Sequence, residues 1–252
     1  MAQISPEVAD ILRRATIKGT HLTLPPRLDR SEYLAVNAVI ENLGGKWSRK
    51  DKAHVFASSD AFVALDEALD RGAFTDRKKE LQYFPTPDAL ARRMAELANV
   101  SNGDCVLEPS AGQGSIVNAL LFYTPRIVAV EIDPTNCLAL ATQRHIEPHC
   151  ADFLDWAEEA DGVEFDAVVM NPPFCKGQDI AHVYAAWRLL KTGGRLVAIT
   201  SPGWQFRQDK LHTAFASWLK DLGAITTELE PGTFKESGTD VRTTLIVMKK
   251  DK

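Results

Sequence analysis

Two loops of this 252-residue chain carry residue types that could bind a small molecule and act on it. The first, which we call the glycine loop, reads EPSAGQG at 108–114 and lies between an apolar run and a helix-like segment. Glycines at 112 and 114 let the backbone approach a ligand closely, and the N–H groups at the start of a helix attract an anion. Glu131 ends the next apolar run, where a carboxylate can accept both hydroxyls of a ribose. This pattern predicts a nucleoside site, and a glycine-rich turn that binds nothing is the alternative.

The second loop, which we call the reactive loop, is Asn171-Pro172-Pro173-Phe174 and follows the apolar run FDAVVM. Its prolines fix the backbone and lack N–H donors, so the Asn171 side-chain oxygen and the Pro172 carbonyl can act together as acceptors. Such a pair suits a planar amine such as N6 of adenine, because hydrogen bonding draws the nitrogen lone pair out of ring conjugation. The Phe174 ring can stack on the base. A rigid turn without chemistry is the alternative interpretation.

A third loop follows the run 146–150 and contains Asp152 and Phe153. The Asp152 carboxylate can accept an exocyclic amino group, and the Phe153 ring can cover an adenine face. The four cysteines occur without zinc-ligand spacing, so we expect no metal site. Cys175, beside the reactive loop, is interpreted as incidental.

The elements that must position these loops alternate between strands and helices from residue 81 onward. Such alternation predicts a doubly wound α/β fold, whose parallel sheet is covered on both faces. No helix fits between the last two strands, at 224–229 and 242–248, so this pair is predicted to be antiparallel. Pro148 places its strand at the edge of the sheet, because proline cannot donate to a neighbouring strand. The other strands are predicted at 105–108, 127–131, 146–150, 165–170 and 196–200.

The first part of the chain has a different pattern, which predicts a small α+β domain at 1–78 ahead of a larger domain at 79–252. A predicted hairpin at 45–54 gathers four basic residues around Trp47. Lysine and arginine pair with phosphates and an aromatic ring stacks on bases, whereas a solvated turn with a buried Trp47 is the alternative. Loops after the fourth and fifth strands offer further candidates. The candidate nucleic-acid-binding residues are Lys46, Trp47, Arg49, Lys50, Lys52, Lys176, Trp204 and Arg207.

The composition is that of an ordinary globular chain, 45% hydrophobic and 25% charged. The net charge of −5 argues against a protein that coats nucleic acid through its overall field, so any contact needs a local basic patch. No apolar run approaches the roughly 20 residues of a membrane span. The N-terminus lacks the apolar core of an export signal, so we expect a cytoplasmic protein.

The glycine loop, VEID, ADF and NPPF, together with Tyr83-Phe84-Pro85-Thr86-Pro87, resemble the amino-group DNA methyltransferases, which use S-adenosylmethionine. The resemblance covers about 81–252, and the motif order matches the gamma-type arrangement of that family. It implies a seven-stranded, Rossmann-like class I methyltransferase sheet. It also implies methylation of adenine N6 in DNA, with the target base flipped out of the helix.

The resemblance also assigns roles to individual residues. The catalytic residues it implies are Asn171, Pro172, Pro173 and Phe174. With Gly114 and Phe153, which the loops themselves suggest, the expected cofactor-binding residues are Phe84, Thr86, Glu108, Ser110, Gly112, Gly114, Glu131, Ile132, Asp152, Phe153 and Asn171.

Several alternatives stay open at this point. Release-factor glutamine methyltransferases and some RNA methyltransferases also carry Asn-Pro-Pro-aromatic, and cytosine N4 is another amine in DNA. A DNA-binding regulator or decoy without turnover is an alternative of another class, whereas a nicotinamide oxidoreductase would leave NPPF unexplained. The family's usual target-recognition domain has no counterpart after the last predicted strand. We therefore expect recognition by the N-terminal domain, by a partner or second copy, or low specificity, as in a restriction-modification or orphan enzyme.

Overall fold

The computed structural model describes residues 2–56, 60–74, 84–123, 126–160, 162–235 and 242–251. The chain divides into two compact units, Met1–Leu81 and Gln82–Lys252. Within the described residues, no helix has the length and hydropathy that would let it cross a membrane.

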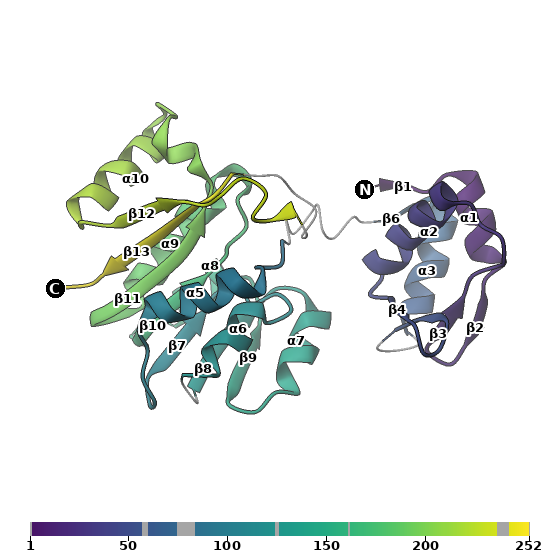
Figure 1. Ribbon diagram of the computed structural model, residues 1–252, viewed down its shortest axis with the longest axis horizontal. Coiled ribbons are helices and arrows are strands. Elements are labelled where there is room, and N and C mark those ends of the chain that lie inside the picture. The colour runs from purple at the N-terminus through teal and green to yellow at the C-terminus, as the bar shows by residue number, and fades with distance from the viewer. Residues whose placement is uncertain are drawn as a thin grey trace. The chain divides into compact units, whose positions relative to one another are not determined.

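The larger unit is built on a seven-stranded sheet with the strand order β12-β13-β11-β10-β7-β8-β9 (Figure 1). Neighbouring strands from β11 to β9 in this order run parallel, whereas β13 lies antiparallel to both β11 and β12. The antiparallel last pair and the edge position of the strand that contains Pro148 are therefore confirmed. The strands are β7 (Cys105–Glu108), β8 (Arg126–Glu131), β9 (Ile146–Cys150), β10 (Phe165–Met170), β11 (Leu190–Thr200), β12 (Ile225–Glu228) and β13 (Thr244–Lys249).

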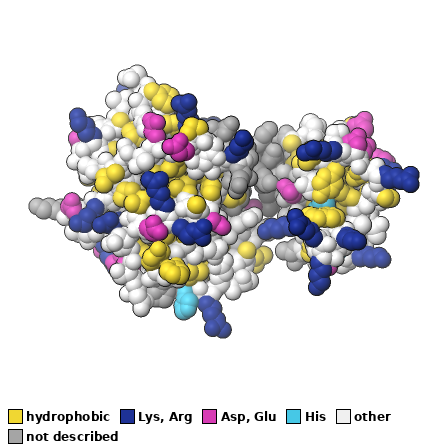
Figure 2. Space-filling view, in the orientation of Figure 1, with side chains coloured by type: hydrophobic (Ala, Val, Ile, Leu, Met, Phe, Trp, Pro, Cys, Tyr) yellow, Lys and Arg dark blue, Asp and Glu magenta, His cyan; other side chains and the backbone are white. Residues whose placement is uncertain are grey.

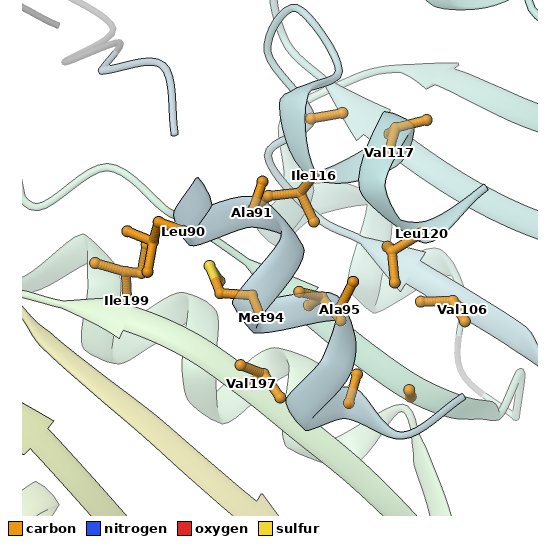
Figure 3. Close-up of a cluster of buried hydrophobic side chains, with 14 of the residues drawn as sticks. Leu90, Ala91, Met94, Ala95, Val106, Ile116, Val117, Leu120, Val197 and Ile199 are labelled. Carbon is orange, nitrogen blue, oxygen red and sulfur yellow. The ribbon is translucent and has the colours of Figure 1, made fainter. Parts of the chain in front are cut away.

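Helices cover both faces of this sheet. Successive residues of a strand point to opposite sides, so each apolar strand presents side chains that must be buried on both faces. On one face, Met94 of α5 and Leu120 of α6 belong to the same buried cluster as Val197 of β11 (Figure 3). On the other face, Val183 of α9 belongs to a cluster with Val168 of β10. The helices are α5 (Asp88–Ala98), α6 (Ser115–Leu120), α7 (Pro134–Ala141), α8 (Phe153–Glu159), α9 (Gln178–Arg188) and α10 (Lys210–Asp221), with the 3-10 turns η1 (Cys175–Gly177) and η2 (Pro202–Gln205).

Strand β11 begins at Leu190, well before the predicted start at 196. The register with β10 shifts near its beginning, since Phe165 pairs with Leu190 and Ala167 pairs with Arg195. A Cβ on Gly194 would lie 2.9 Å from the Asp166 carbonyl oxygen, so the backbones pass too closely for a side chain. Gly193 and Gly194 lie in this stretch, where the register shift marks a bulge or irregularity of the strand pair.

The smaller unit has its own core between the described helices α1, α2 and α3 and a four-stranded antiparallel sheet of order β2-β3-β5-β4. Leu22 and Ile40 are fully buried there. Helix α2 begins with a capping box, in which Asp29 and Glu32 each accept the other's backbone N–H over 2.8 Å. The elements are β1 (Ala2–Gln3), α1 (Pro6–Arg13), β2 (Thr16–Lys18), β3 (His21–Thr23), α2 (Arg30–Asn42), β4 (Lys46–Ser48), β5 (Ala53–Val55), α3 (Asp60–Arg71) and β6 (Ala73–Phe74).

Candidate functional site

The glycine loop leaves the end of β7 and leads into α6. Gly112 has φ 54° and Gly114 has φ 83°, both in the left-handed region that favours glycine. Gly114 is the N-cap of α6, and a Cβ there would lie 3.1 Å from Leu140 Cδ2. The loop is tied to β8, because Ala111 N–H donates to the Val130 carbonyl over 3.0 Å. The result is a backbone turn without side-chain bulk in front of a helix N-terminus.

The Glu131 carboxylate is fixed beside this turn at the end of β8. Its oxygens accept from Gly112 N–H over 2.6 Å and from Asp133 N–H over 2.7 Å. The side chain is buried, and burial raises the pKa of this carboxyl. The next residue, Ile132, is 47% exposed and presents an apolar surface. These donors, together with the Asn136 side chain, orient the carboxylate, whose oxygens can accept more than one hydrogen bond each.

Glu108 ends β7 and is almost completely buried. Its Oε2 has no hydrogen-bond partner among the described residues. Burial and the neighbouring Glu131 carboxylate raise the pKa of Glu108 well above its ordinary value. A buried polar atom without a partner is costly, and perturbed carboxyl groups gather at functional sites. This position therefore favours a bound group that forms a hydrogen bond with the Glu108 carboxyl.

The Asn171 amide forms hydrogen bonds through its nitrogen, whereas its oxygen has no partner among the described residues. Its Nδ2 donates to the Phe84 carbonyl over 3.0 Å and to Thr86 Oγ1 over 3.1 Å. Its Oδ1 is buried and has no hydrogen-bond partner among the described residues. The segment at 84–86 and the end of β10 therefore fix the amide so that one acceptor stays unused.

The rest of the reactive loop follows Asn171 directly along the chain. Pro172 is buried, whereas Pro173 and Phe174 are partly exposed. Phe174 and Phe84 both pack against the buried cluster under α5 and α6. A partly exposed aromatic ring next to the unused acceptor can stack on a planar group that enters from solvent.

Asp152 and Phe153 have partners within the fold. Asp152 caps α8, and its Oδ1 accepts Leu154 N–H over 2.7 Å. The Phe153 ring is 3% exposed, and its centroid lies 5.2 Å from that of His182. Ser110 Oγ lies 3.4 Å from Nδ1 of the same histidine. Phe153 is packed into the core, and its covering of an adenine face stays a prediction. A cofactor role for Asp152 stays a prediction.

Sequence reasoning missed two buried polar residues on α9. Asp179 Oδ2 accepts Ser201 N–H over 2.8 Å and Ser201 Oγ–H over 2.7 Å, while its Oδ1 has no partner among the described residues. Burial lowers the pKa of His182 to about 4, so this ring is neutral at neutral pH. Through Ser110 and Ser201, the pair ties α9 to the loops after β7 and β11. Their signal in the sequence is an acid and a histidine three positions apart on the buried face of a helix.

The basic residues predicted to bind nucleic acid in the N-terminal unit lie on the surface. Figure 2 shows Lys and Arg side chains, in dark blue, on the face of this unit that is in view. Trp47 is 49% exposed, and its ring lies edge-on to the buried His54, with 5.1 Å between centroids. The alternative of a buried Trp47 is therefore wrong. The exposed basic residues of the β4–β5 hairpin are Lys46, Arg49, Lys50 and Lys52.

The three candidates in the larger unit differ in their surroundings. Lys176 and Arg207 are exposed. The ring centroid of Trp204 lies 6.0 Å from that of Phe215, and Trp204 Nε1–H donates to Thr200 Oγ1 over 3.1 Å. Trp204 is partly exposed, so a substrate contact by this residue stays a prediction.

A family model described as Methyltransferase small domain matches residues 88–219. The ribosomal RNA small subunit methyltransferase A of Phenylobacterium zucineum is 30% identical over 125 residues, which are 48% of this chain and 44% of that protein. A type II methyltransferase of Thermus thermophilus is 38% identical over 99 residues, which are 38% of this chain and 22% of that protein. The chain thus spans less than half the length of these curated relatives.

Among solved structures, a modification subunit of a putative type I restriction enzyme from Vibrio vulnificus has a similar fold. The TM-score is 0.58 at 19% identity, and the match covers 79% of this chain and 51% of that one. The predicted Rossmann-like methyltransferase fold is therefore confirmed. The match of the family model takes in half of the sequence, including the glycine loop, Glu131 and the reactive loop. The chain therefore belongs to the Methyltransferase small domain family, and its cofactor is S-adenosylmethionine.

Proposed function

We propose that this protein transfers a methyl group from S-adenosylmethionine to the N6 amine of an adenine in DNA. The observation that carries the proposal is the buried Asn171 Oδ1, which lacks a partner among the described residues while both hydrogens of the amide are used. A buried acceptor of this kind is costly unless a ligand fills it. An exocyclic amine that enters the reactive loop supplies the missing donor.

The residues around the glycine loop fit the cofactor. Glu108 Oε2 is buried without a partner among the described residues and can take a donor from it. Glu131 would hold the ribose hydroxyls, and the exposed Ile132 would lie against the cofactor's adenine. Gly112 and Gly114 would leave room for the methionine end. When bound, the cofactor supplies an electrophilic methyl group on a sulfonium sulfur.

The reactive loop then orients the target. Asn171 Oδ1 and the Pro172 carbonyl each accept one N–H of the amine, which turns the nitrogen lone pair away from the ring. Phe174 stacks on the base, and Thr86 keeps the Asn171 amide from rotating. Holding the reacting atoms in line lowers the entropic part of the barrier, so that positioning supplies much of the rate. An adenine inside a duplex must first be flipped out, which costs a few kcal/mol.

The segment 84–87 supports DNA as the substrate. Its Phe-Pro-Thr-Pro residues resemble those of the DNA enzymes, and two of them hold the Asn171 amide. We further propose that residues 1–78 form an accessory domain that contacts DNA and that residues 79–252 form the catalytic domain of a cytoplasmic enzyme. The exposed Trp47 and the basic β4–β5 hairpin support the DNA contact, because stacking and phosphate pairing need such side chains.

The direct test is transfer of tritiated methyl groups from S-adenosylmethionine to unmodified DNA, followed by nucleoside analysis. We expect label in N6-methyladenine. Asn171→Ala should abolish transfer and leave cofactor binding, measured by calorimetry, close to wild type. Asn118→Ala, at an exposed position on α6, is the control and should keep full transfer. Unchanged transfer by Asn171→Ala, or label in another nucleoside, would refute the proposal.

Adenine in RNA is a second candidate, because similarity to a ribosomal RNA methyltransferase extends over 48% of this chain. The target amine is the same, so the reactive loop would act in the same way. Competition between unlabelled DNA and RNA of equal length separates the two. DNA should suppress labelling at much lower concentration, and the opposite order would make RNA the substrate.

A further inference from the structure

The loop after β11, residues 201–209, borders the reactive loop. Ser201 is held by Asp179, which lies in the first turn of the helix that follows the reactive loop. On the other side, a Cβ built on Gly177 would lie 2.8 Å from Leu211 Cδ2. Leu211 therefore packs directly on the backbone that follows Phe174 and Lys176. These contacts place the 201–211 segment at the rim of the site.

This rim carries an exposed aromatic side chain on a fixed backbone. Phe206 is 64% exposed. Its N–H and that of Arg207 both donate to the Gly203 carbonyl, over 3.3 and 2.9 Å. Gln205 Nε2 donates to Thr244 Oγ1 over 3.2 Å, which ties the loop to β13. A ring on a rigid support loses little entropy when a partner binds to it.

Cationic side chains outnumber acids in this loop and beside it. Lys176, Arg207 and Lys210 are exposed, and none of them forms an ion pair among the described residues. The acid of the loop, Asp209, is already engaged, because both of its oxygens lie within 2.8 Å of His212 Nδ1. The rim therefore offers cations to a polyanion beside an uncovered ring.

We propose that Phe206 stacks on a base next to the methylated adenine, and that Lys176, Arg207 and Lys210 bind the adjoining phosphates. This inference rests on the proposed function and names the surface that holds its DNA. An aromatic ring among cations is the arrangement that binds unpaired nucleotides, because every base has a stacking face and every linkage has a charge. Trp204, two residues earlier, is less exposed than Phe206, because its ring packs against Phe215.

The test uses the full chain, saturated with S-adenosylhomocysteine, and a fluorescently labelled DNA oligonucleotide whose binding is followed by anisotropy. Phe206→Ala should raise the Kd for DNA about 5- to 100-fold, the range that base stacking on an aromatic ring provides. Phe122→Ala is the matched control. Phe122 is 87% exposed but lies between α6 and the start of β8, at the amino ends of the strands. Its loss should leave the Kd unchanged.

A Phe206→Ala protein that binds DNA as tightly as wild type would overturn the inference and leave the proposed function standing, provided that wild type methylates DNA. A wild-type chain that neither binds nor methylates DNA would overturn both. The salt dependence of binding tests the cations. Lys210→Gln should reduce the slope of log K against log salt by about 1, whereas Lys220→Gln, at the other end of α10, should not. Equal slopes in wild type, Lys210→Gln and Lys220→Gln would show that Lys210 does not bind a phosphate.

Discussion

The contact between Thr86 and Asn171 gives the sharpest prediction. Thr86 is buried, and its Oγ1 accepts one of the two hydrogens of the Asn171 amide over 3.1 Å. Thr86→Val keeps the branched shape of the side chain and removes this acceptor. The bond to the Phe84 carbonyl remains, so the amide keeps one support and gains freedom to rotate. We expect slower methyl transfer from a folded protein.

The magnitude follows from the change at one buried N–H. A neutral hydrogen bond contributes about 0.5–1.5 kcal/mol net, and a buried donor left without a partner costs about 1–3 kcal/mol. A loss of about 1–2 kcal/mol in the transition state slows the reaction about 5- to 30-fold. Thr86→Ser keeps the hydroxyl and should stay within about 3-fold of wild type.

The assay is single-turnover methyl transfer with S-adenosylmethionine and DNA both saturating, so that weaker binding does not enter the rate. The melting temperature of each variant, measured by circular dichroism, shows whether the fold is kept. Wild-type rates in Thr86→Val would refute the role of this contact. A Thr86→Ser protein as slow as Thr86→Val would also refute it, because the hydroxyl would then be irrelevant.

Three other predictions concern buried or strained groups of the same site. Folded His182 takes up its proton near pH 4 and the unfolded residue near pH 6.5, so stability should fall as the pH drops through this window. The fall should be about 2 kcal/mol from pH 7 to pH 5 by urea unfolding, and an equal fall in His182→Gln would contradict this. Glu108 has a raised pKa in the folded state, so its contribution to stability is lost as the pH rises. Glu108→Gln should therefore gain thermal stability over wild type more at pH 8 than at pH 5, and parallel pH curves would exclude this explanation. Gly114→Ala should cost about 1–2 kcal/mol through its positive φ and also weaken S-adenosylmethionine binding in calorimetry. Gly72→Ala, with φ 63° and open space, should lose stability alone, and equal cofactor affinities in both variants would argue against the glycine loop as the cofactor site.

The sequence predicts the arrangement of the larger unit well, because its signals are local and regular. Apolar runs alternate with helical segments, Pro148 marks the edge strand, and the sequence between the last two strands has no helical pattern. The early start of β11 is not predictable in this way. It depends on the pairing of Leu190 with Phe165 and on the close passage of Gly194 against the Asp166 carbonyl oxygen, which the local sequence does not show.

Individual site residues depend on contacts that the sequence does not show. Trp204 and Phe206 are both aromatic and lie on one loop, but a bond to Thr200 and packing on Phe215 turn only Trp204 toward the core. Phe153 is buried for a similar reason. These partners lie on other elements of the fold, so loop position alone does not separate a contact residue from a core residue.

Asp179 and His182 are missed for a related reason. Their partners, Ser201 and Ser110, lie 22 and 72 positions away along the chain. A polar residue within a helical pattern is ambiguous until its neighbours across the fold are known. The motif residues of the glycine and reactive loops are different, since their types and order within a few positions already indicate their chemistry.

The central claim is that the unused oxygen of Asn171 receives the amine that is methylated. A crystal structure of the chain with S-adenosylhomocysteine and an adenine-containing oligonucleotide measures this contact directly. The account predicts the adenine N6 about 2.7–3.2 Å from Asn171 Oδ1, with Phe174 stacked on the same base. A bound oligonucleotide whose adenine lies elsewhere, with Oδ1 still unpartnered, would contradict it.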